Sequence, residues 1–183
     1  MTGHHLILGD LTDFITGETL KDTHDERYRQ NISRLLVNEK GYCKRDIEPR
    51  RKLLLEAGNK KAIVKIDFLI TLTKKVCMLI KYGPGSLVTR RRPALAASRL
   101  VASYQVPIAV VTNGEDAEIL DGATGKVTAR GLVRIPSRTE LQNMADNIEF
   151  EPVSKERAQI ESRLFYCYEV DDRCPCDEDI CKM

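Results

Sequence analysis

Three consecutive segments with the pattern of β-strands lie between two predicted helices, and this order constrains the fold more than any other feature. The segments are Ile47–Glu56, Ala62–Leu72 and Val76–Tyr82, and Gly83-Pro84-Gly85 ends the third. The first alternates apolar and polar residues imperfectly, whereas the other two are largely apolar. A helix, three strands, a second helix and a further strand predict an α/β domain with a mixed central sheet flanked by helices.

The helix before these strands is predicted to begin at Thr23. Thr23 and Glu26 have the spacing of a capping box, in which Thr23 is the N-cap and the Glu26 side chain reaches back to the N-cap backbone. Apolar residues then recur at helical spacing, and Gly41 ends the helix. Glu26 is therefore expected to have a structural role whatever else it does.

The elements after the third strand are predicted as follows. The second helix covers roughly Arg90–Tyr104, with Thr89 as its N-cap. A buried strand covers Val106–Thr112. The remaining elements are a short hairpin (residues 117–121 and 126–130) and two polar helices, Arg138–Asn147 and Ser154–Tyr166, followed by a cysteine-rich tail.

Composition places the chain among soluble globular proteins. Of its 183 residues, 42 % are hydrophobic and 31 % are charged, which excludes wholesale disorder. No apolar run is long enough to span a bilayer, and the first residues do not have the pattern of a signal peptide. We therefore expect a cytoplasmic protein without a membrane partner, in which cysteines are thiols or metal ligands and not disulfides.

Charge is strongly segregated along the chain. Residues 44–92 contain 14 Lys and Arg against 4 Asp and Glu, whereas residues 110–183 contain 9 against 16. A basic face attracts nucleic acid through the release of counterions from its phosphates. The alternative is a solvated surface with no ligand, which is the commoner explanation of charged segments.

Four basic residues of this segment are candidate nucleic-acid contacts. Arg90, Arg91 and Arg92 stand at the predicted start of the second helix, where the helix dipole disfavours cations and backbone N–H groups favour phosphate. Lys52 lies on the polar face of the first predicted strand. In the alternative interpretation, the three arginines pair with acidic residues of the C-terminal part, such as Asp171 and Asp172.

Two charged residues interrupt apolar strands, and a buried charge is costly unless it is paired. Asp67 lies within the second strand segment and Lys81 near the end of the third, so the two side chains can meet across the sheet. In metal-dependent phosphodiester hydrolysis, carboxylates hold Mg²⁺, and a lysine positions water or stabilises the developing charge. A simple ion pair at the edge of the sheet is the alternative.

Six short motifs occur in an order that resembles the restriction-endonuclease-like, PD-(D/E)xK fold. The likeness is closer to the N-terminal nuclease domain of type I restriction enzyme R subunits and covers about residues 25–125. The motifs are Glu26-Arg27-Tyr28-Arg29-Gln30, Ile47-Glu48, Asp67-Phe68, Ile80-Lys81, Val110-Val111-Thr112-Asn113-Gly114 and Ala117-Glu118-Ile119-Leu120.

The resemblance implies an αβββαβ core, and together with the predicted elements after residue 136 it leads us to divide the chain into three parts. Residues 1–22 are an N-terminal extension, residues 23–136 the restriction-endonuclease-like domain, and residues 137–183 a helical extension with the cysteine-rich tail. The resemblance also implies a Mg²⁺-dependent DNA endonuclease, with DNA as the partner.

The catalytic residues that the resemblance implies are Asp67 and Lys81, with Glu26 or Glu48 as an additional acid. This chain departs from the pattern at Leu79, which stands where the family has an acid two residues before the lysine. Strand alternation places Leu79 on the same face as Lys81. One carboxylate fewer predicts weaker binding of a hard divalent cation, and low or absent cleavage.

The tail carries four cysteines within fifteen residues: Cys167, Cys174, Cys176 and Cys181. This number suits Zn²⁺ or an iron–sulfur cluster, although the spacing is not that of a zinc ribbon. Ordinary reduced thiols are the alternative.

The resemblance and the basic segment together favour a nucleic-acid-binding protein with a restriction-endonuclease-like domain, which we expect to be a weak or degenerate Mg²⁺-dependent DNA endonuclease. The second hypothesis is a non-catalytic scaffold that docks to a protein partner through a metal-stabilised tail.

Overall fold

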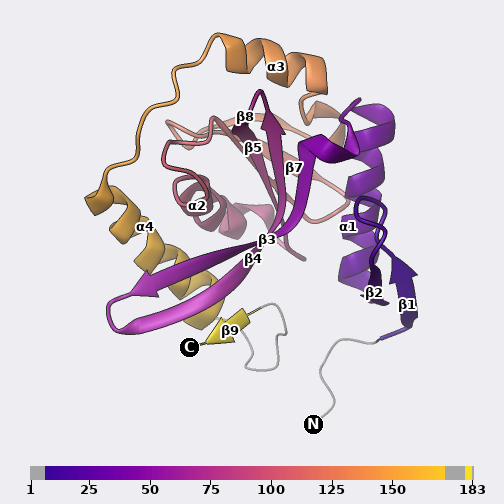
Figure 1. The fold of residues 1–183 in the computed structure, drawn as a ribbon, viewed down its shortest axis with the longest axis horizontal. Coiled ribbons are helices and arrows are strands. Elements are labelled where there is room, and N and C mark those ends of the chain that lie inside the picture. The colour runs from indigo at the N-terminus through magenta and orange to yellow at the C-terminus, as the bar shows by residue number, and fades with distance from the viewer. Residues whose placement is uncertain (1–6, 172–179, 183) are drawn as a thin grey trace.

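The computed structural model describes residues 7–171 and 180–182 and contains one mixed β-sheet with helices packed on both faces (Figure 1). The strands are β1 (Gly9–Thr12), β2 (Thr19–Asp22), β3 (Ile47–Ala57), β4 (Lys60–Leu72), β5 (Lys75–Tyr82), β6 (Ile108–Thr112), β7 (Ala117–Asp121), β8 (Val127–Arg130) and β9 (Ile180–Lys182). The helices are α1 (His24–Arg34), α2 (Leu87–Ser98), α3 (Arg138–Asp146) and α4 (Lys155–Tyr166), with shorter helical turns η1 (Leu35–Glu39), η2 (Lys44–Asp46), η3 (Leu132–Arg134) and η4 (Cys167–Asp171).

The strands of the main sheet follow the order β3-β4-β5-β6-β7-β8, and β9 pairs with β4. The pairs are antiparallel except β5 and β6, which are parallel and are connected through α2. β1 and β2 form a separate hairpin beside α1. The predicted mixed sheet and the αβββαβ order of α1, β3, β4, β5, α2 and β6 are therefore confirmed.

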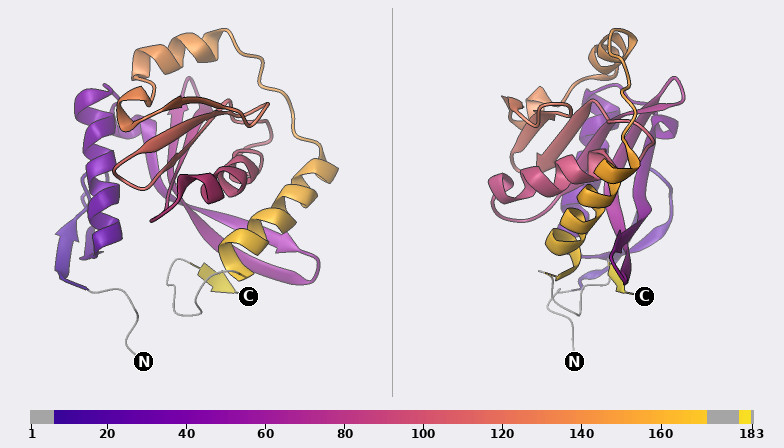
Figure 2. Two further views of the ribbon diagram at one scale, coloured as in Figure 1. Left: turned by 180° about the vertical axis from the view of Figure 1, so that it is seen from behind. Right: turned by 90° about the vertical axis from the view of Figure 1, so that its left-hand side faces the viewer.

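Two apolar clusters hold the helices to the sheet. The first joins α1 and α3 to side chains such as Phe68 and Ile80. The second joins α2 and α4 to the alternate positions, such as Leu69 and Leu79. Figure 2 shows α4 lying along the long hairpin of β3 and β4, close to α2. The two largely apolar strands β4 and β5 thus have both faces buried, as strands covered on both sides require.

The helix starts follow their capping residues, with one exception. Thr23 accepts the Glu26 backbone N–H at 3.1 Å, as predicted. Ser137 and Ser154 cap α3 and α4 in the same way.

The exception is α2, which begins at Leu87 and ends at Ser98, so the predicted range Arg90–Tyr104 was wrong at both ends. Gly85, with a φ of +85°, reverses the chain directly after β5, and Leu87 packs against the second cluster. The chain is therefore helical three residues before Arg90. The three arginines lie past the first turn, where the dipole argument made for them does not apply.

Substituting Thr23 by Ala should lower the free energy of unfolding by about 1 kcal/mol, because the first turn of α1 then loses its side-chain cap. Thr89→Ala is the matched control, since the Thr89 hydroxyl donates to the carbonyl of Ser86, the residue before α2, and caps no backbone N–H. Its effect should stay within about 0.5 kcal/mol. Urea unfolding measures both variants, and equal losses would contradict the assignment of the cap.

Candidate active site between strands β4 and β5

Asp67 and Lys81 face each other across the neighbouring strands β4 and β5. Phe68 pairs with Ile80 in this antiparallel register, so Asp67, which precedes Phe68, and Lys81, which follows Ile80, stand next to each other just beyond that pair. Lys81 Nζ lies 3.6 Å from Asp67 Oδ2, and the side chains are only 8 % and 7 % exposed. The predicted contact between the two residues is confirmed.

The Asp67 carboxylate has two further donors. Its Oδ1 accepts a hydrogen bond of 2.7 Å from Nε of Arg29, which projects from α1. Its Oδ2 accepts the backbone N–H of Tyr82 at 2.9 Å. Burial alone would raise the pKa of Asp67, but the charges of Lys81 and Arg29 and these hydrogen bonds outweigh it and hold the pKa below its usual value. Asp67 is therefore a buried carboxylate that is fully charged at neutral pH.

Lys81 has a second carboxylate partner that sequence reasoning missed. Glu169 of η4 places Oε2 at 3.2 Å from Lys81 Nζ, and its side chain is 3 % exposed. Lys81 also lies 3.3 Å from the Lys65 carbonyl, to which it donates. One sequence signal could have indicated that Glu169 is buried. Glu169 stands four residues after Phe165 and therefore shares a helical face with an apolar residue.

Glu26 is held differently from the expectation. The capping box is incomplete, because Glu26 Oε1 accepts from Gln30 Nε2 at 2.8 Å and does not reach back to Thr23. Glu26 also contacts two guanidinium groups, those of Arg29 at 3.7 Å and Arg50 at 3.5 Å. The charged partners win because they compensate a buried carboxylate better than one backbone N–H does.

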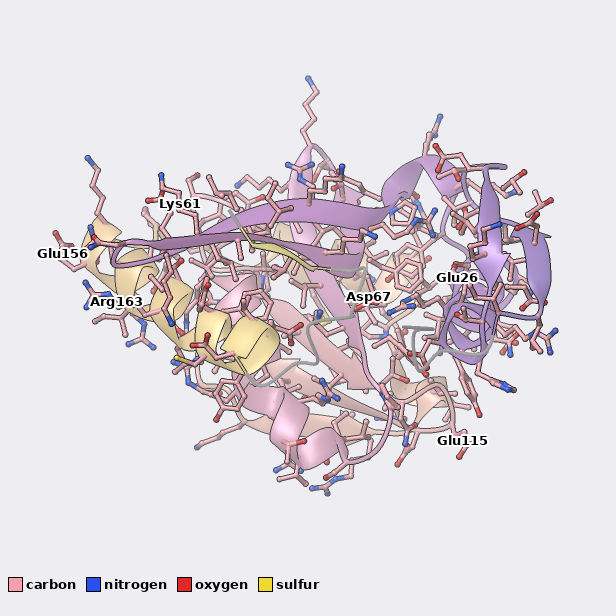
Figure 3. The ribbon with its side chains drawn as sticks, turned by 90° about the horizontal axis from the view of Figure 1, so that it is seen from below. Glu26, Lys61, Asp67, Glu115, Glu156 and Arg163 are labelled. Atoms are coloured by element: carbon pink, nitrogen blue, oxygen red, sulfur yellow. The ribbon has the colours of Figure 1, made fainter. Side chains whose placement is uncertain are left out.

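These contacts continue into one chain of alternating charges, which we call the ion-pair chain. Arg50 Nη1 lies 2.8 Å from Asp13 Oδ2, and hydrogen bonds from Arg50, Thr16 and Gln30 outweigh burial and lower the pKa of Asp13 to about 2. Figure 3 shows Glu26 and Asp67 in the part of the molecule where α1 approaches β4. The members of the ion-pair chain, in order of contact, are Asp13, Arg50, Glu26, Arg29, Asp67, Lys81 and Glu169.

Arg50 reaches this position through a strained backbone. Its φ of +53° is unusual for a residue with a side chain, and it occurs within β3. Such strain persists only where the surroundings hold it, and it is typical of functional sites. Here it accompanies the contacts of Arg50 with Asp13 and Glu26.

Two residues of the expected site lie apart from the ion-pair chain. Glu48 forms an ion pair of 2.6 Å with Arg51, and its side chain is 44 % exposed. Leu79 is fully buried within the second apolar cluster, on the face that also carries Lys81. The structure therefore brings Glu26 toward Asp67 through Arg29 and gives Glu48 another partner.

The candidate nucleic-acid contacts divide into paired and unpaired residues. Arg91 forms two hydrogen bonds of 2.6 Å to Glu118, and Arg92 lies 2.7 Å from the fully buried Glu161. Arginine pairing with later acidic residues thus occurs, but with acids other than the two suggested. Asp171 contacts Lys60 instead, and Asp172 lies outside the described residues.

Arg90 and Lys52 have no ion pair within the described part of the chain. Arg90 lies over Gly83, where an added Cβ would approach the guanidinium carbon to 2.9 Å, and Lys52 is exposed on β3. Neither cation is thus compensated by an acidic side chain there, although Arg90 donates a hydrogen bond of 3.4 Å to the Pro84 carbonyl.

A comparison with protein-family models identifies the chain's relatives. The model of the type I restriction enzyme R protein N-terminus matches residues 24–136, which is more than half of the chain. The chain belongs to this family. No curated protein and no solved structure matches it. The matched residues of this restriction-enzyme domain include Asp67, Lys81 and the αβββαβ core, whereas Glu169 lies beyond them.

The restriction-endonuclease-like fold implies a Mg²⁺ site, and the residues present offer few ligands for such an ion. Asp67 supplies a buried carboxylate, the kind of ligand that Mg²⁺ prefers, but Leu79 supplies none. Among the described residues, no group of three or more His, Cys, Asp and Glu side chains converges. Mg²⁺ is nevertheless bound in many enzymes by one or two carboxylates together with substrate phosphates, so the site fits an ion that is held weakly.

The cysteine tail falls mostly outside the described residues. Cys167 is an exposed thiol at the start of η4. Cys174 and Cys176 lie outside the described part, and the side chain of Cys181 is not described. Zn²⁺ or an iron–sulfur cluster in the tail stays a prediction. In the same described part of the chain, no helix has the length and apolarity needed to cross a membrane.

Asp67→Asn should lower the free energy of unfolding by about 3 kcal/mol at pH 7, because Arg29 and Lys81 then lose a buried counter-charge. The folded-state pKa of Asp67 lies below its unfolded value, so this stabilisation is complete above about pH 4 and is lost as the pH falls through the folded pKa. Urea unfolding of wild type and variant at pH 7 and pH 3 measures the difference.

The control for this prediction is Asp10→Asn, which breaks an exposed ion pair with Lys21 and should change stability by less than about 0.5 kcal/mol. If Asp67→Asn lowers the free energy of unfolding by the same amount at pH 7 and pH 3, the charge of the carboxylate contributes nothing to stability.

Proposed function

We propose that this chain binds DNA and hydrolyses its phosphodiester bonds slowly with Mg²⁺ through a site centred on Asp67 and Lys81. The single observation that carries the proposal is the buried contact of these two residues at 3.6 Å. They stand on the second and third strands of the core, where the family resemblance implies its acid and its lysine. Family membership supports the same restriction-endonuclease-like role.

Each residue of the pair would have a distinct task. A bound Mg²⁺ supplies an activated water and neutralises charge on the phosphate. Asp67 would hold the ion, and Arg29 fixes the orientation of that carboxylate through its hydrogen bond of 2.7 Å. Lys81 would position the attacking water or donate to the phosphoryl oxygen that gains charge.

The arrangement favours a slow enzyme. Both oxygens of Asp67 already accept from protein donors, so a cation must compete with Arg29 and Lys81 for them. Leu79 offers no oxygen on the same face. Weak metal binding follows, and with it a low rate at ordinary Mg²⁺ concentrations.

A domain that binds DNA without cutting it is the second candidate. Leu79 favours this candidate. It stands where the family pattern has an acid, is completely buried in an apolar cluster and supplies no metal ligand. The two candidates differ in one measurable property, which is cleavage that depends on Asp67.

Supercoiled plasmid incubated with the wild-type protein and Mn²⁺ or Mg²⁺ should be nicked slowly, and Asp67→Asn and Lys81→Arg should each abolish nicking. Gel electrophoresis follows the reaction, and circular dichroism verifies that both variants are folded. Nicking that persists in both folded variants would contradict the proposed site. Binding of the plasmid by wild type without any nicking would favour the non-cleaving candidate.

Replacing Arg90 and Lys52 together by Ala should weaken DNA binding and reduce its salt slope by up to about two units, one for each phosphate that the variant no longer neutralises. Arg92→Ala is the contrasting variant, because Arg92 compensates the buried Glu161. It should lower thermal stability more than it lowers affinity. Fluorescence anisotropy of labelled duplex DNA at several salt concentrations tests both, and an unchanged slope in the double variant would remove the basic-face argument.

A further inference from the structure

We propose that Glu169, from the C-terminal extension, is the second carboxylate of the Asp67–Lys81 site and takes the place of the acid missing at Leu79. This inference rests on the proposed function and names the residue that completes its site. Glu169 lies outside residues 24–136, so the family pattern does not assign it a role.

Glu169 belongs to the site through its contact with Lys81. The lysine nitrogen lies 3.2 Å from Glu169 Oε2 and 3.6 Å from Asp67 Oδ2, so two carboxylates flank one cation. All three side chains are less than a tenth exposed. A buried glutamate is costly unless a compensating group holds it, and Lys81 is the partner toward which its carboxylate is directed.

The C-terminal segment that carries Glu169 shares one apolar cluster with Leu79. Leu79 belongs to the same buried cluster as Phe165 and Tyr166 of α4 and Val170 of η4. The segment itself packs mainly on β3, β4 and α2, and Glu169, the residue next to Val170, reaches Lys81 from there.

The other acids near the site are held elsewhere. Glu26 is engaged by Gln30, Arg29 and Arg50 on the α1 side of the ion-pair chain. Glu48 pairs with Arg51 and is half exposed. Neither forms an ion pair with Lys81 in the described part of the chain. Of these two acids and Glu169, only Glu169 forms an ion pair with Lys81.

The test is Mn²⁺ binding by the full chain, measured by isothermal titration calorimetry and by electron paramagnetic resonance of free Mn²⁺. Glu169→Gln keeps the size of the side chain and removes its charge, so it should lower Mn²⁺ affinity at least tenfold and slow nicking in parallel. Glu156→Gln is the control, since Glu156 is an exposed acid on α4 (Figure 3). It should leave affinity and nicking unchanged.

A rescue experiment adds a readout that a merely structural role would not give. Leu79→Glu introduced into the Glu169→Gln protein should restore part of the Mn²⁺ affinity, because an acid returns to the same face. The rise in unfolding temperature on adding Mn²⁺ should be present in wild type, absent in Glu169→Gln and present again in the double variant. If the double variant does not fold, the single variants and their control still decide the matter.

Three results would overturn the inference. Unchanged Mn²⁺ affinity in Glu169→Gln, with loss of affinity in Asp67→Asn, would leave the proposed function standing without Glu169. Faster nicking by Glu169→Gln would show that this residue blocks the site. Nicking by wild type without Mn²⁺ binding at Asp67 would place the metal elsewhere. Failure of the proposed function is distinct from these, because it is the absence of nicking by wild type.

Discussion

The buried carboxylate of Asp67 is the constraint on which this structure depends. A charge in the middle of an apolar strand is tolerated only if fixed partners replace its water. Arg29 of α1, Lys81 of β5 and the Tyr82 N–H supply those partners. Because they come from both α1 and β5, satisfying one side chain also fixes these two elements against β4. Stability and the candidate chemistry therefore share the same atoms.

The ion-pair chain extends this constraint beyond the family domain. At one end Asp13 precedes α1, and at the other Glu169 follows α4, so both flanking segments contribute charges to the site. The strained backbone of Arg50 indicates that the surrounding contacts are strong enough to hold it. Groups in such a network act together, and removing one member leaves its neighbours with uncompensated charge.

The features that the sequence predicted were local or followed from strand order. Alternation and turn residues located β4 and β5, and two charges in apolar strands predicted that Asp67 meets Lys81. Missed features depend on distant contacts: Glu169 is 88 residues from Lys81 along the chain. Glu26 illustrates a different limit: its local pattern predicted a capping box, but its carboxylate is held by Gln30 and Arg29 of the same helix and by Arg50 of β3. At α2, the turn at Gly85 set the helix start and overrode the cap predicted at Thr89.

The most direct measurement of the central claim is the location of Mn²⁺ by anomalous X-ray diffraction from crystals soaked in the ion. Mn²⁺ takes the same oxygen ligands as Mg²⁺ and scatters anomalously, so its position is found without assuming any ligand. The account predicts a peak at coordination distance from Asp67 and Glu169, beside Lys81. Ordered Mn²⁺ elsewhere on the protein, with Asp67 still held by Arg29 and Lys81 and no peak between the two carboxylates, would contradict it.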